Sequence, residues 1–321
     1  MKLNRHSFGM LAGKTAARGE RFERVTHADA PETENILPVR DANAALRVAL
    51  FGLGLGPDCE VLVPAFGKHT PGPDVFSVGA RPSYVDVGED IVLNRGNLTR
   101  KLESEYRREN GVWVHKRRGW VLRGIVMTHP LGFSPFVNEV EEFAAEHGLV
   151  LVDDARGALG SRVWSASRST WICAGSGGTV GVASSESASF LVSKDPELLM
   201  LVSMHVKTAE FYDMNAEAMK ELRIAGAQAR KSIGEILSRA GLGNVLETPN
   251  YCQSACREVL LIAEHDRDEA MDRLEEAGFI AESNFYPQAI MEACERQFGY
   301  RKGRCPDSEE LARRAIAVRR K

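Results

Sequence analysis

Residues 149–154 read Leu-Val-Leu-Val-Asp-Asp, four consecutive apolar positions that end in two carboxylates. A strand that is apolar at consecutive positions is typical of a parallel sheet buried on both faces. Strands are also predicted at residues 60–64, 82–87 and 123–129, and an amphipathic helix is predicted over residues 137–147. Strands that alternate with helices in this way predict an α/β fold with a doubly wound, mostly parallel sheet.

The pattern divides the chain into three parts. Residues 1–36 are polar and unpatterned, which predicts an N-terminal arm. Residues 37–244 hold the alternation of strands and helices and form the predicted large domain. Residues 245–321 read strand, helix, strand, helix, with the last helix predicted over residues 308–318. This tail predicts a smaller C-terminal α+β domain. The run from Trp113 to Trp120 predicts a hairpin insertion.

Composition excludes several classes of function. The chain has 321 residues and a formal net charge of -3, which gives no reason to expect nucleic acid or an anionic membrane as a partner. No apolar run approaches the roughly 18 residues that span a bilayer, and the N-terminus lacks the apolar core of a secretory signal. Six scattered cysteines indicate reduced thiols rather than disulfides or a metal site. We therefore expect a cytoplasmic protein that binds no metal.

Six segments, in the same order along the chain, resemble motifs of the DegT/DnrJ-type sugar aminotransferases and dehydratases. They are residues 44–57, residues 60–66 (EVLVPAF), residues 79–87 (GARPSYVDV), residues 129–132 with 147–149, residues 152–155 (VDDA) with Gly160, and residues 284–287 (NFYP) with 298–300. The resemblance implies the fold of the fold-type I enzymes, which use pyridoxal phosphate (PLP) on keto-sugars attached to nucleotides. It also implies an active site built across a dimer interface.

The resemblance assigns Asp154 to the carboxylate that holds the pyridine nitrogen of PLP protonated. Asp154 comes at the carboxyl end of a predicted buried strand, where doubly wound sheets place their ligands. The alternative is that Asp154 only caps the element that follows. Asp153 occupies the position where the family usually has glutamate.

The lysine that forms the Schiff base with PLP has no counterpart. Alignment on Lys194 puts Val180 at the lysine position, and counting forward from Gly160 puts Ala183 there. No lysine occurs between Lys116 and Lys194, so either alignment leads to the same expectation. We expect no covalently bound cofactor.

Two further cofactor contacts are altered. The family binds the PLP phosphate at the start of its first helix, where residues 41–46 read DANAAL. Asn43 and Ala44 hold the phosphate positions, but Asp41 adds a negative charge beside them, which costs about 3 kcal/mol at ~5 Å and an effective dielectric near 20. Lys68 replaces the aromatic residue that stacks on the pyridine ring, and a cation repels a protonated ring.

Two interpretations of these losses remain open. One is drift in an inactive paralogue, and the other is a site rebuilt for a different ligand. In the second, Lys68, His69, Arg156 and His129 converge on the old cofactor pocket and bind a phosphate or a carboxylate. Ser176 and Thr179 lie in a Gly-rich stretch that can also bind an anion through N–H and hydroxyl groups.

Three functions follow as alternatives. The first is a cofactor-free pseudo-aminotransferase that serves as an auxiliary or binding subunit in small-molecule or sugar-nucleotide metabolism, as a homodimer or as a heterodimer with an active homologue. The second is an enzyme of altered chemistry that uses Asp154, His129, Lys68 or His69 as acid–base groups. The third binds pyridoxamine phosphate (PMP) or PLP noncovalently, as the lysine-lacking dehydratases of the family do. Those place histidine at the lysine position, which is apolar here.

Overall fold

The computed structural model describes residues 35–88, 91–132, 137–158, 160–164, 169–171, 180–184, 189–193, 195–208, 216–240, 243–245, 252–253, 256–287 and 299–321. Three of the predictions fall wholly or mainly outside these ranges. They are the N-terminal arm over residues 1–36, the anion-binding role of Ser176 and Thr179, and the alignment anchor Lys194.

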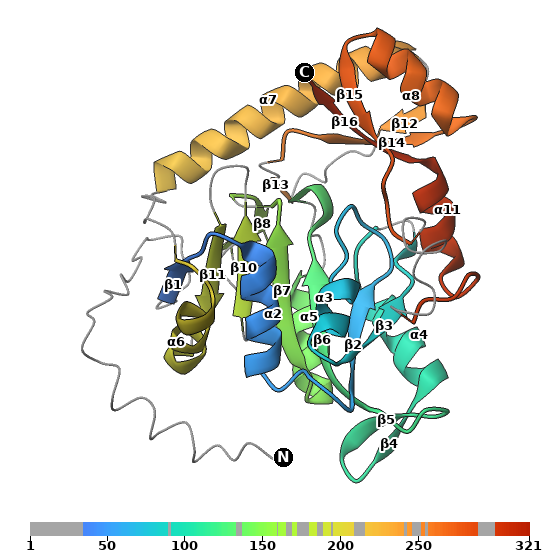
Figure 1. The fold of residues 1–321 in the computed structure, drawn as a ribbon. Helices are drawn as coiled ribbons and strands as arrows, with labels where there is room; N and C mark the ends of the chain where they lie inside the picture. Colours follow the sequence, from blue (N-terminus) through green and yellow to red (C-terminus); the bar gives the residue numbers. More distant parts are fainter. Residues whose placement is uncertain are drawn as a thin grey trace.

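The large sheet is mixed and mostly parallel, as predicted (Figure 1). In spatial order its main path is β1 (Asn35–Pro38), β11 (Ser189–Ser193), β10 (Val180–Ser184), β7 (Val150–Arg156), β6 (Val121–Thr128), β2 (Cys59–Pro64) and β3 (Arg81–Val85). The five strands from β10 to β3 run parallel, and β11 is antiparallel to both of its neighbours. Val126 on β6 and Val152 on β7 are fully buried, which explains the consecutive apolar positions.

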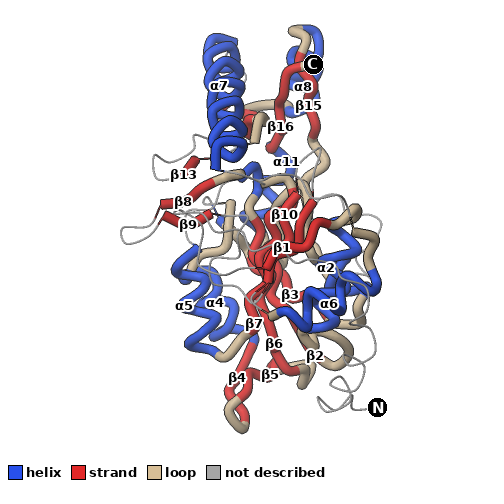
Figure 2. Tube along the Cα trace, turned by 90° about the vertical axis from the view of Figure 1, so that its left-hand side faces the viewer, coloured by secondary structure: helices blue, strands red, loops and turns tan. Residues whose placement is uncertain are grey.

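Helices cover both faces of this sheet (Figure 2). One face carries α2 (Ala42–Gly52), α3 (Gly72–Ser77) and α6 (Pro196–His205). The other carries α4 (Arg95–Glu105) and α5 (Val137–His147). A layer of helices on each face is the doubly wound arrangement, so the predicted fold class is confirmed.

The predicted hairpin is present but shifted along the chain. Its strands are β4 (Tyr106–Glu109) and β5 (Val112–His115), and β5 also pairs with the start of β6. Asn110 and Gly111 form the tip with φ angles of 49° and 84°. An Asn-Gly pair favours this left-handed turn, and that signal precedes the run from Trp113 to Trp120.

A second, antiparallel sheet lies above the carboxyl ends of the large sheet (Figure 1). Its strands, in order, are β12 (Gly243–Val245), β14 (Val259–Ala263), β16 (Ala315–Arg320) and β15 (Phe279–Glu282). The long helix α7 (Ala216–Ala240) and α8 (Arg267–Glu276) pack against one face through a shared apolar cluster. The domain boundary near residue 245 stays a prediction.

The helix predicted over residues 308–318 is wrong in its second half. Helix α11 (Pro306–Arg314) ends at Arg314, and the chain continues as β16. Ile316 and Val318 are fully buried against α7 and α8, while β14 and β15 satisfy the backbone groups of β16 from both sides. Tertiary pairing therefore overrides the local helical pattern.

The remaining described strands form a third sheet of β13 (Cys252–Gln253), β8 (Arg162–Trp164) and β9 (Ser169–Trp171). A 3-10 turn, η3, spans Pro130–Gly132. Among the described helices, none combines the length and the apolar character that crossing a bilayer requires.

Candidate functional site

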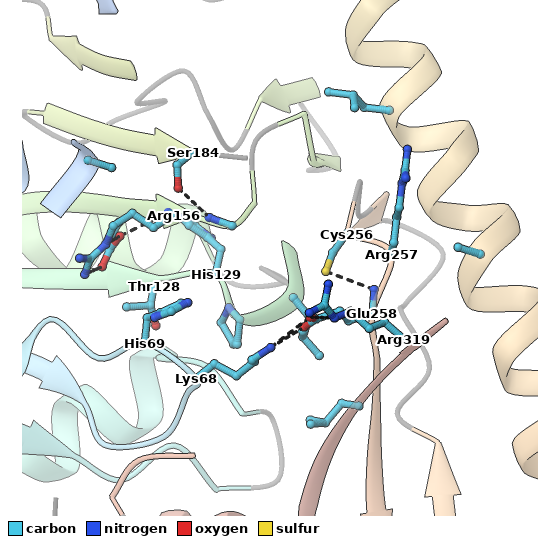
Figure 3. A pocket seen from close by; sticks show the side chains of 18 of the residues that line it. Lys68, His69, Thr128, His129, Arg156, Ser184, Cys256, Arg257, Glu258 and Arg319 are labelled. Atoms are coloured by element: carbon cyan, nitrogen blue, oxygen red, sulfur yellow. Dashed lines mark hydrogen bonds and ion pairs between the residues drawn. The ribbon is translucent and has the colours of Figure 1, made fainter. Parts of the chain in front are cut away.

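A cleft of about 1180 Å³ lies between the carboxyl ends of the parallel strands and the second sheet (β12, β14, β16 and β15), which is called the small sheet below (Figure 3). The predicted site residues that line it are Asn43, Lys68, His69, His129, Asp154 and Arg156. Ala44 is not among the lining residues. Parallel strands end at one edge of a sheet, so β6 contributes Thr128, β7 contributes Arg156 and β10 contributes Ser184 to the same cleft.

Arg156 binds the carboxylate of Asp154 with two hydrogen bonds. Its Nε donates to Oδ1 and its Nη2 donates to Oδ2, each over 2.7 Å. The Asp154 side chain is 2% exposed and that of Arg156 is 9% exposed. Such a bidentate pair is the strongest common contact between arginine and a carboxylate, and it uses both oxygens of Asp154.

The other end of the same guanidinium is also engaged. Nη1 of Arg156 lies 3.0 Å from Oδ2 of Asp74 on α3, and it donates to the side-chain oxygen of Asn43. Asp74 in turn accepts from Arg47 over 3.1 Å. Burial raises the pKa of Asp74 above 3.8, although Arg156 acts in the opposite direction. Burial lowers the pKa of Arg156, but Asp154 and Asp74 outweigh it and raise that pKa further, so Arg156 stays charged.

The start of α2 is occupied by a side chain of the protein itself. Asp41 is the N-cap, and its Oδ1 accepts from the backbone N of Asn43 over 2.9 Å and of Ala44 over 3.0 Å. Free N–H groups at a helix N-terminus are the usual binding site for a phosphate. At this helix the cap aspartate already satisfies two of them.

Lys68 reaches across the cleft from the loop after β2 to the small sheet (Figure 3). Its Nζ donates to the two oxygens of Glu258 over 3.0 and 2.9 Å, and lies 2.7 Å from Oε2 of Glu282. Arg319 on β16 pairs with both glutamates at 3.9 and 3.4 Å. Burial lowers the pKa of Lys68, but Glu282 and Glu258 outweigh it and the pKa is raised.

Two histidines complete the floor of the cleft. Burial, and then the charge of Arg156, lowers the pKa of His69 below 6.5, which favours the neutral ring at pH 7. Nε2 of His129 contacts Oδ1 of Asp153, and both side chains are almost fully buried. A carboxylate in this position orients an imidazole and fixes which of its nitrogens carries the proton.

Val180 and Ala183, the two candidate lysine positions, lie on β10. In the register with β7, Val180 is opposite Val152 and Ala183 is opposite Ala155. Ser184, one residue after Ala183, lines the cleft. Among the described residues, no group of three or more His, Cys, Asp or Glu side chains could hold a metal ion.

The family model of the DegT/DnrJ/EryC1/StrS aminotransferases matches residues 10–191, more than half of the chain. The chain belongs to this family. Its members use PLP, and the family includes enzymes that act on sugars linked to nucleotides.

Similarity to individual DegT/DnrJ/EryC1/StrS proteins is low. The pleiotropic regulatory protein of Geobacillus stearothermophilus is 22% identical over 306 residues, which covers 85% of this chain and 76% of that protein. The dTDP-3-amino-3,4,6-trideoxy-alpha-D-glucose transaminase of Streptomyces venezuelae is 30% identical over 131 residues, 41% of this chain and only 31% of the enzyme.

Solved structures of family members share the fold. A DegT DnrJ EryC1 StrS aminotransferase from Brucella abortus superposes with a TM-score of 0.71 and 20% identity, over 89% of this chain and 80% of that one. DesI, crystallised in the presence of its TDP-sugar product, gives a TM-score of 0.68 and 18% identity, over 89% of this chain and 75% of that one. At these identities the likeness shows the fold alone.

Sequence reasoning missed most of the partners in this family member's cleft. Asp74, Glu258 and Glu282 carried no motif, and they are far in sequence from the cations that they bind. No motif included the basic C-terminus, but Arg319, Arg320 and Lys321 line the cleft from β16 and the residue after it. The available signal was the continuous apolar run of residues 315–318 (AIAV), which is as consistent with a buried strand as with a helix.

Proposed function

We propose that this family member is a cofactor-free pseudo-aminotransferase, which binds an anionic small molecule in its cleft and forms no Schiff base with PLP. The observation that carries the proposal is the bidentate contact of Arg156 with Asp154. A pyridine nitrogen needs one of those carboxylate oxygens, and an internal guanidinium holds both.

Three residues or segments argue against a fit to PLP. Asp154 is engaged by Arg156, and Asp41 holds the N–H groups that start α2. Residues 117–193 contain no lysine. Lys68 does line the cleft, but two glutamates hold its amine on the side of the small sheet. We therefore assign no step to the cofactor.

The ligand class follows from the relatives. One is named as a transaminase of a dTDP-linked amino sugar, and DesI was crystallised in the presence of a TDP-sugar product. We propose a sugar nucleotide or another phosphorylated small molecule as the ligand. As an auxiliary subunit in the cytoplasm, the protein would act as a homodimer or together with an active homologue.

The experiment is incubation of the purified protein with excess PLP, followed by borohydride reduction and peptide mass spectrometry. We expect no Schiff-base absorbance and no pyridoxyl-lysine, because Schiff-base formation needs an available lysine amine. A pyridoxyl adduct on Lys68 or Lys194 would overturn the proposal. Calorimetry with PMP tests noncovalent binding, and saturable binding of PMP at micromolar concentration would favour the dehydratase-like alternative.

The contact between His129 and Asp153 favours one second candidate, an enzyme with acid–base chemistry that is independent of PLP. An imidazole oriented by a buried carboxylate can remove a proton next to a carbonyl group. Incubation of a nucleotide-linked keto-sugar in deuterated buffer, without PLP, would then place deuterium in the sugar, and His129→Gln would abolish the exchange. Absence of exchange with the unmodified protein contradicts this candidate.

A further inference from the structure

The two cations in the deep part of the cleft are already neutralised by the protein. Arg156 contacts the carboxylates of Asp154 and Asp74, and Lys68 contacts those of Glu258 and Glu282. An anionic ligand that bound Arg156 or Lys68 would have to displace a charge-assisted contact. The predicted role of these two side chains as the anion site therefore carries a cost that the sequence did not reveal.

Arg257 and Arg320, at the other end of the cleft, differ from this pair. The register of β14 with β16 places Val259 opposite Val318. Arg257 comes two residues before Val259, and Arg320 comes two residues after Val318. Residues two apart on a strand share a face, so Arg320, the last residue of β16, lies with Val318 on the face that packs against α7. Figure 3 shows the Arg257 side chain alongside this long helix.

Among the residues that the structure describes, neither arginine has a carboxylate partner. Arg320 donates through Nη2 to the hydroxyl of Ser232 on α7 over 2.6 Å, whereas Arg257 has no hydrogen-bond partner within the described part of the chain. Both side chains are exposed and both line the cleft. An anion that contacted both guanidiniums would gain a charge-assisted hydrogen bond from each without displacing a carboxylate.

We propose that Arg257 and Arg320 bind the phosphate or diphosphate group of the ligand, on the side of the cleft formed by α7. A guanidinium can donate to two phosphate oxygens at once. The hydroxyl of Ser232 already holds the guanidinium of Arg320 in place before a ligand binds. Gln228, one turn earlier on α7, lines the same wall and adds an amide. The assignment rests on the proposed function, because it places the anionic part of that ligand.

Calorimetry with thymidine diphosphate and with inorganic pyrophosphate tests the assignment. Arg257→Gln and Arg320→Gln are each expected to weaken binding at least about tenfold, since each removes a charge-assisted contact. Arg301→Gln is the matched control, because Arg301 is exposed and lies outside the cleft lining. Circular dichroism and a thermal melt check that every variant is folded.

The outcomes separate the two claims. Loss of affinity in both variants, with Arg301→Gln unchanged, supports the assignment. Unchanged affinity in either variant overturns the assignment of that arginine pair and leaves the proposed function standing. Absence of saturable binding of either probe to the unmodified protein overturns the proposed ligand class and the assignment with it.

Discussion

The guanidinium of Arg156 is bound to both carboxylate oxygens of Asp154, which comes two residues earlier in the chain. The two residues end β7, and side chains two apart on a strand project from the same face. The strand therefore brings the pair together without help from any distant element. The distant contribution is Asp74, which binds the remaining side of the guanidinium from α3.

Arg156→Ala should lower the free energy of unfolding by about 3 kcal/mol or more at pH 7. Removing one member of a buried ion pair leaves uncompensated charge, here on Asp154, while Asp74 keeps only its contact with Arg47. Urea denaturation measures the change, and Arg301→Ala serves as the exposed control. A variant as stable as the unmodified protein would show that the pair contributes nothing net.

The deficit of Arg156→Ala should shrink in acid. Burial already raises the pKa of Asp74 above 3.8, and loss of the arginine raises it further. A carboxyl with a raised pKa takes up protons in the folded state first, so its penalty is largest above the folded pKa and disappears as the pH falls below 3.8. Denaturation curves at a series of pH values, limited to those at which the protein stays folded, measure this trend.

The pKa of His69 should respond to the charge of Arg156. In the unmodified protein, burial and the charge of Arg156 lower its pKa below 6.5, while Asp154 acts in the opposite direction. Replacing Arg156 with glutamine removes a lowering effect and leaves Asp154 unopposed, so the pKa of His69 is expected to rise. Proton–carbon NMR of the histidine rings, with His69→Gln for assignment, measures the shift. An unchanged titration would mean that the two side chains are not coupled.

Lys68→Met should destabilise the protein by about 1–2 kcal/mol, a modest value because the glutamates are partly exposed. The hydrogen bond from Lys68 lowers the pKa of Glu282 below 4.5, so this stabilisation is present above pH 4.5 and is lost as the pH falls below it. The pKa of Lys68 is raised above 10.5, so its share is lost as the pH rises above that value. In the variant the loss at high pH should be absent and the loss in acid should be smaller, because Arg319 still lowers the pKa of Glu282. Both losses should be kept in Lys302→Met, a control at an exposed loop position.

Asp41→Ala should cost about 1 kcal/mol, because it removes the N-cap of α2, and Asp41→Asn should cost much less. The urea midpoint measures both effects. Asp266→Ala, which removes a comparable cap from α8, gives the reference magnitude. If Asp41→Ala matched the unmodified protein while Asp266→Ala did not, the cap on α2 would be unimportant for folding.

Local pattern predicted β2, β6 and β7 of the large sheet, because each contains at least three consecutive apolar residues. The predicted strand over residues 149–154 is β7, and the predicted helix over residues 137–147 is α5 without a change of boundary. The order of these segments also led to the family. Such runs depend on burial on both faces, and that condition is visible in the sequence.

The charge pairing of the cleft could not be predicted in the same way. Lys68 and Glu258 are 190 residues apart, and only the docking of the small sheet above the large one joins them. A motif identifies which side chains reach a pocket, but it does not reveal which of them are neutralised there. Lys68 and Arg156 line the cleft, yet Lys68 is engaged by Glu258 and Glu282 and Arg156 also by Asp74, three carboxylates that no pattern marked.

The carboxylates that pair with Lys68 and Arg156 neutralise these cations in the folded protein whether or not a ligand is bound. Proteins that bind a vitamin-derived group gain stability from it by mass action, and they lose that stability when the supply falls. Here the cations and the carboxylates that pair with them belong to the same chain, so their pairing does not depend on the supply of a small molecule. We expect the steady-state amount of this protein to follow its synthesis and to be insensitive to vitamin B6 starvation.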